Sequence, residues 1–299
     1  MPVFNMLSQY CTKKIKLFVR YLRTWIDPYF ARFKFYFSSN KPEWLSYSAL
    51  EDLQKKYPQP IWNQYDDANI LIRSSKRAAA IQKMLGKQFN RINDILEIGC
   101  WDGMVSAGLQ KSGKTTTAVD YCSEGFHRNA KEIGVKLLQM DAMQMQLPND
   151  TFDFIFSIDA FEHFANPDKV FLEINRLLRK NGLLYLSFGP IFQSPFGLHA
   201  DHSVSVPYCQ ILFERKTMED FIVNNNLTPI DFGQTNSWTL KMYKTLFKSC
   251  LELKILKYYE IHDPQHLKII AQYPSCFKSK AIDFNEFTVS GIEILLQKV

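Results

Sequence analysis

The fold of this chain is decided by the stretch Ile95-Leu96-Glu97-Ile98-Gly99-Cys100-Trp101-Asp102-Gly103. It is an apolar run that enters a turn containing two glycines. A helix-like segment follows, and a second apolar run ends at Val119-Asp120, 17 residues after Gly103. This order predicts the first β-α-β unit of a nucleotide-binding α/β sheet. Glycine lets backbone approach a ligand closely, and an acid at the tip of the second strand can accept both ribose hydroxyls.

Two other nucleotide-binding patterns are incomplete here. A dinucleotide site needs Gly-x-Gly-x-x-Gly, and Trp101 stands where the second glycine would admit a pyrophosphate. Residues 108–115 match the phosphate-loop pattern Gly-x-x-x-x-Gly-Lys-Thr letter for letter. A phosphate loop must follow a strand and open a helix. Here residues 104–109 are helical in character and residues 115–119 form a short β-branched strand, so residues 111–114 are expected to be a helix C-cap loop.

Five motifs between residues 94 and 190 carry a family resemblance. They are Glu97-x-Gly99-x-x-x-Gly103, Asp120-Tyr121, Met140-Asp141-Ala142, residues 152–163 and residues 173–184. In this order and spacing the chain resembles the class I, Rossmann-like S-adenosylmethionine-dependent methyltransferases of the type 11-like group. The resemblance implies an α/β fold with a seven-stranded, mostly parallel sheet and helices on both faces. It also implies S-adenosylmethionine as the cofactor.

The resemblance assigns cofactor contacts to these motifs. The backbone of the first turn would face the methionine half, Glu97 would orient the turn or the amino group, Asp120 would hold the ribose and Asp141 the adenine amine. Trp101 stands where the family commonly has a small residue. The expected cofactor-binding residues are Glu97, Gly99, Cys100, Gly103, Asp120, Tyr121, Asp141, Ala142 and Ser157.

Three histidines are candidates for the base that methylation of a hydroxyl requires. They are His163, on the loop after the fourth strand, and His199 and His202, in a long loop of Gly, Pro and aromatic residues. Each could instead cap or pack. Asp159-x-x-Glu162-His163 also resembles a magnesium pattern of a few O-methyltransferases, which a histidine from residues 199–202 would complete. Because Mg²⁺ prefers oxygen ligands, we expect no metal.

The expected function is O-methylation of a small-molecule or glycan-type acceptor. Two alternatives remain open: a scaffold or membrane-surface adaptor with the same fold and no turnover, and a magnesium-assisted O-methyltransferase. No basic stripe with interleaved aromatic residues follows one face of the core, which argues against nucleic acid as a partner.

Composition bounds the domain organisation. The chain has 299 residues, 46% of them hydrophobic, a length that suits one large domain with extensions. The six cysteines are scattered without a C-x-x-C pair, as in reduced thiols. No apolar run of about 18 residues and no convincing secretory signal are found, so a cytoplasmic location is expected. We expect an amphipathic helical extension and linker over residues 1–60. A methyltransferase domain is expected over residues 61–299, with a substrate lid near residues 190–215.

The N-terminal extension is basic and aromatic. Seven basic residues and one acid, Asp27, lie between Lys13 and Lys34. Apolar residues fall on one helical face, and Asp27-Pro28 interrupts them as an N-cap and first helical position. Residues 1–40 therefore either lie on an anionic membrane surface or pack against the domain or a dimer partner.

Within this extension we expect two helices, over residues 12–26 and 28–37. A linker is expected over residues 41–60. Further along the chain we expect helices over residues 66–90, 216–225 and 239–249 and a last strand over residues 288–296.

Overall fold

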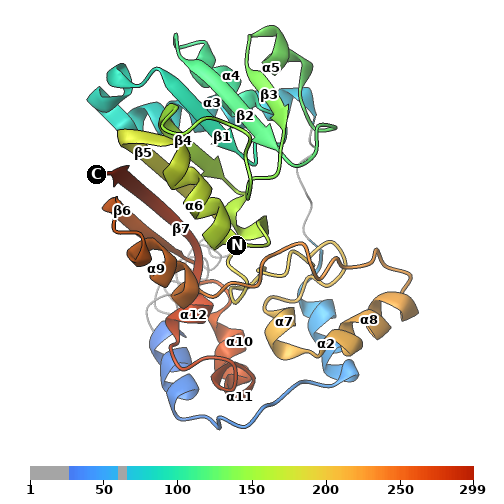
Figure 1. The fold of residues 1–299 in the computed structure, drawn as a ribbon. Coiled ribbons are helices and arrows are strands. Elements are labelled where there is room, and N and C mark those ends of the chain that lie inside the picture. The colour runs from blue at the N-terminus through green and yellow to red at the C-terminus, as the bar shows by residue number, and fades with distance from the viewer. Residues whose placement is uncertain (1–26, 60–65) are drawn as a thin grey trace, which may run out of the picture.

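The computed structural model describes residues 27–59 and 66–299 (Figure 1). Its strands are β1 (Asp94–Ile98), β2 (Thr115–Asp120), β3 (Lys136–Gln139), β4 (Phe152–Ile158), β5 (Leu178–Phe188), β6 (Leu253–His262) and β7 (Val289–Lys298). They form one seven-stranded sheet of order β3-β2-β1-β4-β5-β7-β6. Strands β1 to β5 pair in parallel, whereas β7 is antiparallel to both β5 and β6. The expected seven-stranded, mostly parallel sheet is confirmed.

Helices cover both faces of the sheet, as expected (Figure 1). Side chains alternate between the two faces of each strand, so Ile95 and Phe154 pack with α3 (Asp67–Leu85) and α4 (Met104–Gln110). Leu96 and Ile155 pack on the other side with α6 (Pro167–Leu177) and α9 (Leu240–Ser249). Burial on both faces explains why the inner strands are continuous apolar runs. Shorter elements are the 3-10 helices η1 (Gly86–Arg91) and η2 (Phe161–His163) and the helix α5 (Arg128–Glu132).

A second hydrophobic core lies beside the sheet, in the lower part of Figure 1. It contains α2 (Tyr47–Lys56), α7 (Cys209–Leu212), α8 (Arg215–Asn224), α10 (Leu267–Gln272), α11 (Pro274–Lys278), α12 (Asn285–Thr288) and a helix over residues 27–36. N-terminal and C-terminal parts of the chain therefore share one core. The proposed boundary at residue 60 separates segments in sequence that are packed together in space.

The prediction of a linker over residues 41–60 was wrong, because α2 occupies the centre of this segment. Ser46 caps this helix by accepting a hydrogen bond from the backbone N–H of Ala49. Leu50 and Leu53 are buried in the second core, and this burial stabilises the helix. The prolines around it had led to the prediction of a linker. The helix expected over 28–37 is present over residues 27–36. The one expected over 12–26 lies outside the described residues.

Most other expected elements are found at their predicted places. The helices expected over 66–90, 216–225 and 239–249 correspond to α3, α8 and α9, and the last strand to β7. The run 108–115 passes from α4 through a turn into β2, which is the reverse of the order that a phosphate loop requires. None of the described helices combines the length and apolar composition needed to cross a bilayer.

The insertion near residues 190–215 is packed rather than open. It runs through turns and the single short helix α7, and Ser194, Leu198 and Val204 are buried within it. Gln54 of α2 donates a side-chain hydrogen bond of 3.0 Å to Ser205 Oγ. The insertion thus joins the N-terminal helices to the edge of the sheet, and a role as a substrate lid stays a proposal.

Candidate functional site

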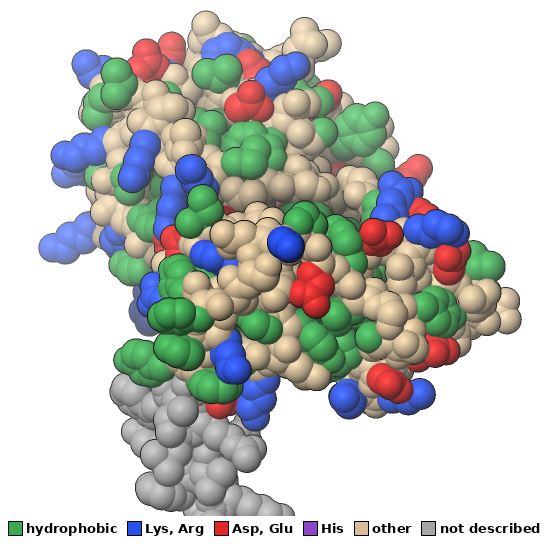
Figure 2. Space-filling model, turned by 90° about the horizontal axis from the view of Figure 1, so that it is seen from below, with side chains coloured by type: hydrophobic (Ala, Val, Ile, Leu, Met, Phe, Trp, Pro, Cys, Tyr) green, Lys and Arg blue, Asp and Glu red, His purple; other side chains and the backbone are tan. Residues whose placement is uncertain are grey.

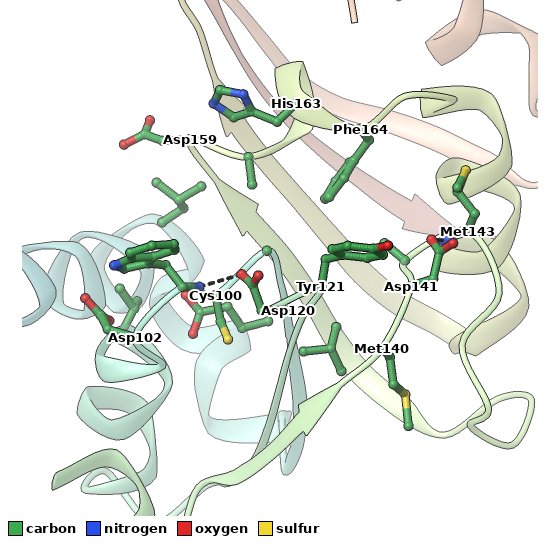
Figure 3. A pocket seen from close by; sticks show the side chains of 18 of the residues that line it. Cys100, Asp102, Asp120, Tyr121, Met140, Asp141, Met143, Asp159, His163 and Phe164 are labelled. Atoms are coloured by element: carbon green, nitrogen blue, oxygen red, sulfur yellow. Dashed lines mark hydrogen bonds between the residues drawn. The ribbon is translucent and has the colours of Figure 1, made fainter. Parts of the chain in front are cut away.

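A cavity of about 1020 Å³ opens at the carboxyl ends of β1, β2 and β4 (Figure 3). Ligands of open α/β sheets bind at this edge. Eight of the residues predicted from sequence line it, and they are contributed by four separate segments. They are Glu97, Gly99, Cys100, Asp120, Tyr121, Asp141, Ala142 and His163.

The turn after β1 is shaped by two glycines. Both Gly99 and Gly103 have φ of +70°, a conformation that costs little only for glycine. A Cβ at Gly99 would lie 2.4 Å from Cβ of Ala160, so only hydrogen fits between the turn and the loop after β4. Gly103 stands at the N-cap of α4 and is not among the described residues that line the cavity.

Glu97 of β1 stabilises this turn through hydrogen bonds to α4, the helix that follows the turn. It is buried, and its Oε2 accepts hydrogen bonds from the backbone N–H and the hydroxyl of Ser106, at 3.1 and 2.6 Å. Burial raises the pKa of the Glu97 carboxyl to about 8, and the two hydrogen bonds oppose that rise only in part. Burial also raises the pKa of the Cys100 thiol far above its usual range. Cys100 is therefore a neutral wall of the cavity rather than a nucleophile.

Asp120 ends β2 and reaches toward the same turn. Its Oδ2 accepts a hydrogen bond of 2.7 Å from the backbone N–H of Trp101, drawn as a dashed line in Figure 3. Its Oδ1 accepts one of 3.1 Å from the N–H of Cys122. Each carboxylate oxygen can accept a second hydrogen bond. The carboxylate is thus oriented toward the cavity with acceptor capacity left for a ligand.

The opposite wall is formed by the segment after β3. Asp141 Oδ1 accepts a hydrogen bond of 2.8 Å from the N–H of Met143. Figure 3 shows Tyr121, Asp141 and Met143 on one side of the cavity and Cys100 and Asp102 on the other. This wall combines the apolar side chains of Met140 and Met143 with the carboxylate of Asp141, a combination that suits a flat ring bearing an amino group.

Two arginines of α3 line the cavity and were missed by the sequence analysis. Arg73 forms an ion pair of 2.5 Å with Asp102, and Arg77 forms one with Asp159. They stand four residues apart and so lie on the same face of the helix. That i, i+4 spacing was the signal available in the sequence. Nothing local indicated which part of the sheet the helix would cover.

His163 follows β4 and points into the cavity region (Figure 3). Its Nδ1 lies 2.7 Å from the backbone carbonyl oxygen of Gln234. A carbonyl oxygen only accepts, so Nδ1 carries the hydrogen and Nε2 of the neutral ring is left as an acceptor. Gln234, also on the cavity wall, could not have been found from sequence, because it is 71 residues away.

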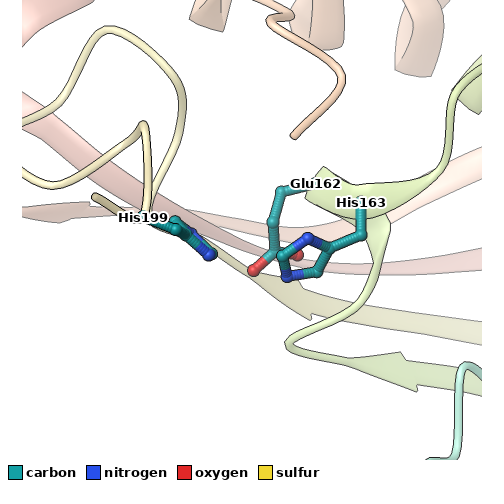
Figure 4. A group of neighbouring side chains, drawn as sticks. All are labelled: Glu162, His163 and His199. Atoms are coloured by element: carbon teal, nitrogen blue, oxygen red, sulfur yellow. The ribbon is translucent and has the colours of Figure 1, made fainter. Parts of the chain in front are cut away.

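Glu162, His163 and His199 form a cluster in which one potential ligand atom from each lies within 4.8 Å of the others. Figure 4 shows His199, on the insertion, directed toward the other two side chains. The His163 and His199 rings are 4.9 Å apart in an edge-on arrangement. Glu162 Oε2 and His199 Nε2 are buried without a hydrogen-bond partner among the described residues. Burial raises the pKa of Glu162 to about 8 and lowers that of His199 to about 4.

The remaining predicted site residues lie elsewhere. Ser157 is buried in β4, outside the described lining of the cavity. His202 is exposed on the insertion, with Nε2 3.3 Å from the carbonyl oxygen of Pro229. Asp159, expected beside Glu162 in a magnesium pattern, is instead paired with Arg77.

Comparisons with known proteins agree with this architecture. Residues 96–186 match the family model described as a methyltransferase domain. The ubiquinone biosynthesis O-methyltransferase of Rickettsia prowazekii is 27% identical over 133 residues, which are 42% of this chain and 53% of that protein. The protein of that name from Agrobacterium fabrum is 26% identical over 96 residues, 30% of this chain and 38% of its own length. The chain spans about half the length, or less, of the curated relatives it matches.

This chain is also similar to solved structures of other proteins. A SAM-dependent methyltransferase of Methanosarcina mazei has 18% identity and a TM-score of 0.44, covering 69% of this chain and 92% of its own. A plantazolicin methyltransferase solved with SAH and a pentazolic desmethylPZN analogue has 15% identity and a TM-score of 0.46. That comparison covers 83% of this chain and 90% of the other.

Proposed function

The chain contains a methyltransferase domain of the class I fold, and we propose that it transfers a methyl group from S-adenosylmethionine to an oxygen of an organic acceptor. This acceptor would be either a small molecule or a glycan-type precursor. One observation carries the proposal. One cavity brings together Asp120, Asp141 and His163, which lie at or just after the carboxyl ends of β2, β3 and β4.

The residues of the cavity suit the cofactor in three places. Asp120 would hold the ribose hydroxyls with its free lone pairs, and Asp141 would accept from the adenine amine. The turn through Gly99 and Cys100 would face the methionine half. When bound, the cofactor supplies an electrophilic methyl group on a sulfonium. The chain's own contribution is orientation, since alignment at about 3 Å gives much of the acceleration in such a displacement.

His163 is suited to prepare a hydroxyl acceptor. Its Nδ1–H donates a hydrogen bond to the carbonyl oxygen of Gln234. Nε2 is therefore free to take up the proton of the hydroxyl group that is methylated. His199 packs against its edge. An oxygen acceptor is further supported by the name O-methyltransferase that the Rickettsia and Agrobacterium relatives carry.

The test uses the full chain with labelled S-adenosylmethionine and a panel of phenolic, catecholic and glycosidic hydroxyl acceptors. We expect label on oxygen of at least one class and none in His163→Ala with the same acceptor. Tight binding of S-adenosylhomocysteine with no transfer to any acceptor would favour the alternative of a scaffold without turnover.

A second candidate, metal-assisted transfer, is favoured by the cluster of Glu162, His163 and His199. Two buried atoms there have no partner in the described part of the chain, and an ion would satisfy both. One carboxylate and two imidazoles suit Zn²⁺, Mn²⁺ or Fe²⁺ better than Mg²⁺. These residues would hold the ion, which would lower the pKa of an acceptor hydroxyl.

Metal content and metal affinity test this second candidate without an activity assay. We expect calorimetric binding of Zn²⁺ or Mn²⁺ by the full chain and its loss in His199→Ala, whereas His202→Ala, on the same insertion, should bind as the parent does. Equal binding by both variants, or none by the parent, would rule the cluster out as a metal site.

A further inference from the structure

The helix over residues 27–36 is attached to the protein by a narrow stripe. Ala31 and Phe35 are fully buried. The Phe35 ring packs edge-on against Phe284 and Phe287, with ring centroids 5.6 and 5.8 Å apart. Asp27, at the start of the helix, is 3.6 Å from Nζ of Lys268 on α10. The helix is the unlabelled blue one at the lower left of Figure 1, beside α10 to α12.

The opposite face of this helix is aromatic and exposed. Successive residues of an α-helix are about 100° apart around the axis, which places the outward residues around Phe33, on the side away from Ala31 and Phe35. The exposed fractions are 73% for Tyr29, 51% for Phe30, 58% for Phe33, 44% for Tyr36 and 78% for Phe37. A helix normally buries such rings, and here five are turned outward.

Cations flank this aromatic face on both sides. Arg32 and Lys34 project to either side of Phe33 by the same helical geometry. The Arg32 guanidinium is 6.0 Å from the Tyr36 ring and the Lys34 ammonium 5.6 Å from that of Phe30. Figure 2 shows hydrophobic side chains beside Lys and Arg side chains at the lower left of this face. The surrounding sequence is basic as well, with seven basic residues and one acid between Lys13 and Lys34.

We propose that the face formed by Tyr29, Phe30, Phe33, Tyr36 and Phe37 docks onto an anionic lipid surface. Aromatic rings insert at the boundary between headgroups and acyl chains, and Lys and Arg on either side reach the lipid phosphates. Charge complementarity selects this occupant, because cations border the apolar face and the acid nearest in sequence, Asp27, is paired with Lys268. The inference does not depend on methyl transfer.

The test is co-sedimentation of the full chain with vesicles. We expect binding to phosphatidylcholine–phosphatidylserine vesicles, weak binding to phosphatidylcholine alone, and release as salt screens the charges. Phe30→Ser/Phe33→Ser/Phe37→Ser should lower partitioning at least about tenfold. The matched control is Leu172→Ser/Val223→Ser/Tyr259→Ser, three residues 65%, 73% and 58% exposed on α6, α8 and β6.

A second pair of variants tests the cations. Arg32→Glu/Lys34→Glu should lower binding to anionic vesicles about tenfold, whereas Lys83→Glu/Lys87→Glu, on exposed parts of α3 and η1, should change it little. All these side chains are exposed, so the thermal transitions of the variants should match the parent.

Three results would overturn the proposal. The parent chain could fail to bind anionic vesicles at low salt, or the triple phenylalanine variant could bind as the parent does. Sedimentation velocity could show a dimer that the same variant converts to monomer without lipid, which would make the face a contact between copies. Hydroxyl-radical labelling of the five aromatic rings separates a further case. Rings that are protected in a monomer without vesicles would mean that another segment of the chain covers the face.

Discussion

The carboxylate of Asp120 accepts a hydrogen bond of 2.7 Å from the backbone N–H of Trp101. Trp101 follows β1, and Asp120 ends the adjacent strand β2. The same carboxylate therefore stabilises the turn after β1 and lines the cavity. Trp101 has a backbone φ of +50°, and its side chain is 57% exposed and also lines the cavity.

Asp120→Ala should weaken binding of S-adenosylhomocysteine by about 2 kcal/mol or more, because it removes the proposed acceptors of the ribose hydroxyls and the hydrogen bond to the N–H of Trp101. Asp120→Asn keeps one oxygen for Trp101 and should lose less. Isothermal calorimetry on both variants measures the difference. Affinity equal to the parent's in Asp120→Ala would contradict the ribose assignment.

Lys114→Ala should leave binding of S-adenosylhomocysteine unchanged, and ATP should bind poorly to parent and variant alike. Lys114 precedes β2, at the edge of the sheet away from the cavity. Its Nζ donates a hydrogen bond of 2.6 Å to the carbonyl oxygen of Ile92 and lies 4.6 Å from the Phe89 ring. A calorimetric loss of ligand binding in this variant would restore the phosphate-loop interpretation.

The elements that could be predicted from the sequence are those marked by a continuous local run of apolar residues. Strands such as β4 are buried on both faces, so their apolar runs are continuous and their ends are marked by turn residues. The edge strand β6 was not predicted. Its exposed Lys254, Ile255 and Tyr259 mix polar and apolar residues, and its position depends on pairing with β7. Helix α2 was missed because the core that buries Leu50 and Leu53 is assembled from distant segments.

The same division holds for the site. Gly99 and Asp120 lie in motifs with fixed spacing, so they could be predicted from sequence alone. Arg77, Gln234 and the approach of His199 to His163 result from long-range packing. No spacing in the sequence carries that information, since each contact joins different layers of the fold.

Glu97→Gln should change how stability depends on pH. Burial raises the pKa of Glu97 in the folded state to about 8, above its ordinary value of 4.5. The folded state therefore holds a proton that the unfolded state releases between these two values. The stability that this proton supplies is present below pH 4.5 and is lost as pH rises to 8, by up to about 1.4 kcal/mol per pH unit. Glu97→Gln should flatten that slope.

Chemical denaturation at several pH values measures this effect. The exposed Glu132 provides a matched control, since Glu132→Gln should keep the slope of the parent. A Glu97→Gln variant that loses stability as steeply as the parent between pH 4.5 and 8 would show that Glu97 is already ionised at the lower pH, with Ser106 stabilising the charge.

His163→Ala should lower turnover by roughly 10²–10⁴-fold and leave the affinity for S-adenosylhomocysteine close to that of the parent. The reason is geometric: the Gln234 carbonyl fixes the ring so that Nε2 is an acceptor. The cofactor contacts that we propose involve other residues, Asp120 and the glycine turn. The matched control is His202→Ala, whose side chain is exposed on the insertion and should be dispensable.

Imidazole rescue separates a base from a structural side chain. If His163 accepts the proton, added imidazole should restore part of the turnover of His163→Ala, because the vacated space admits the free base, and the parent should be unaffected. If the ring only packs against His199, the variant should lose thermal stability and ligand binding together, and imidazole should restore neither. A stable His163→Ala enzyme that binds the cofactor product and turns over at the parent's rate would remove His163 from the chemistry. Proximity within the cavity would then have to account for catalysis.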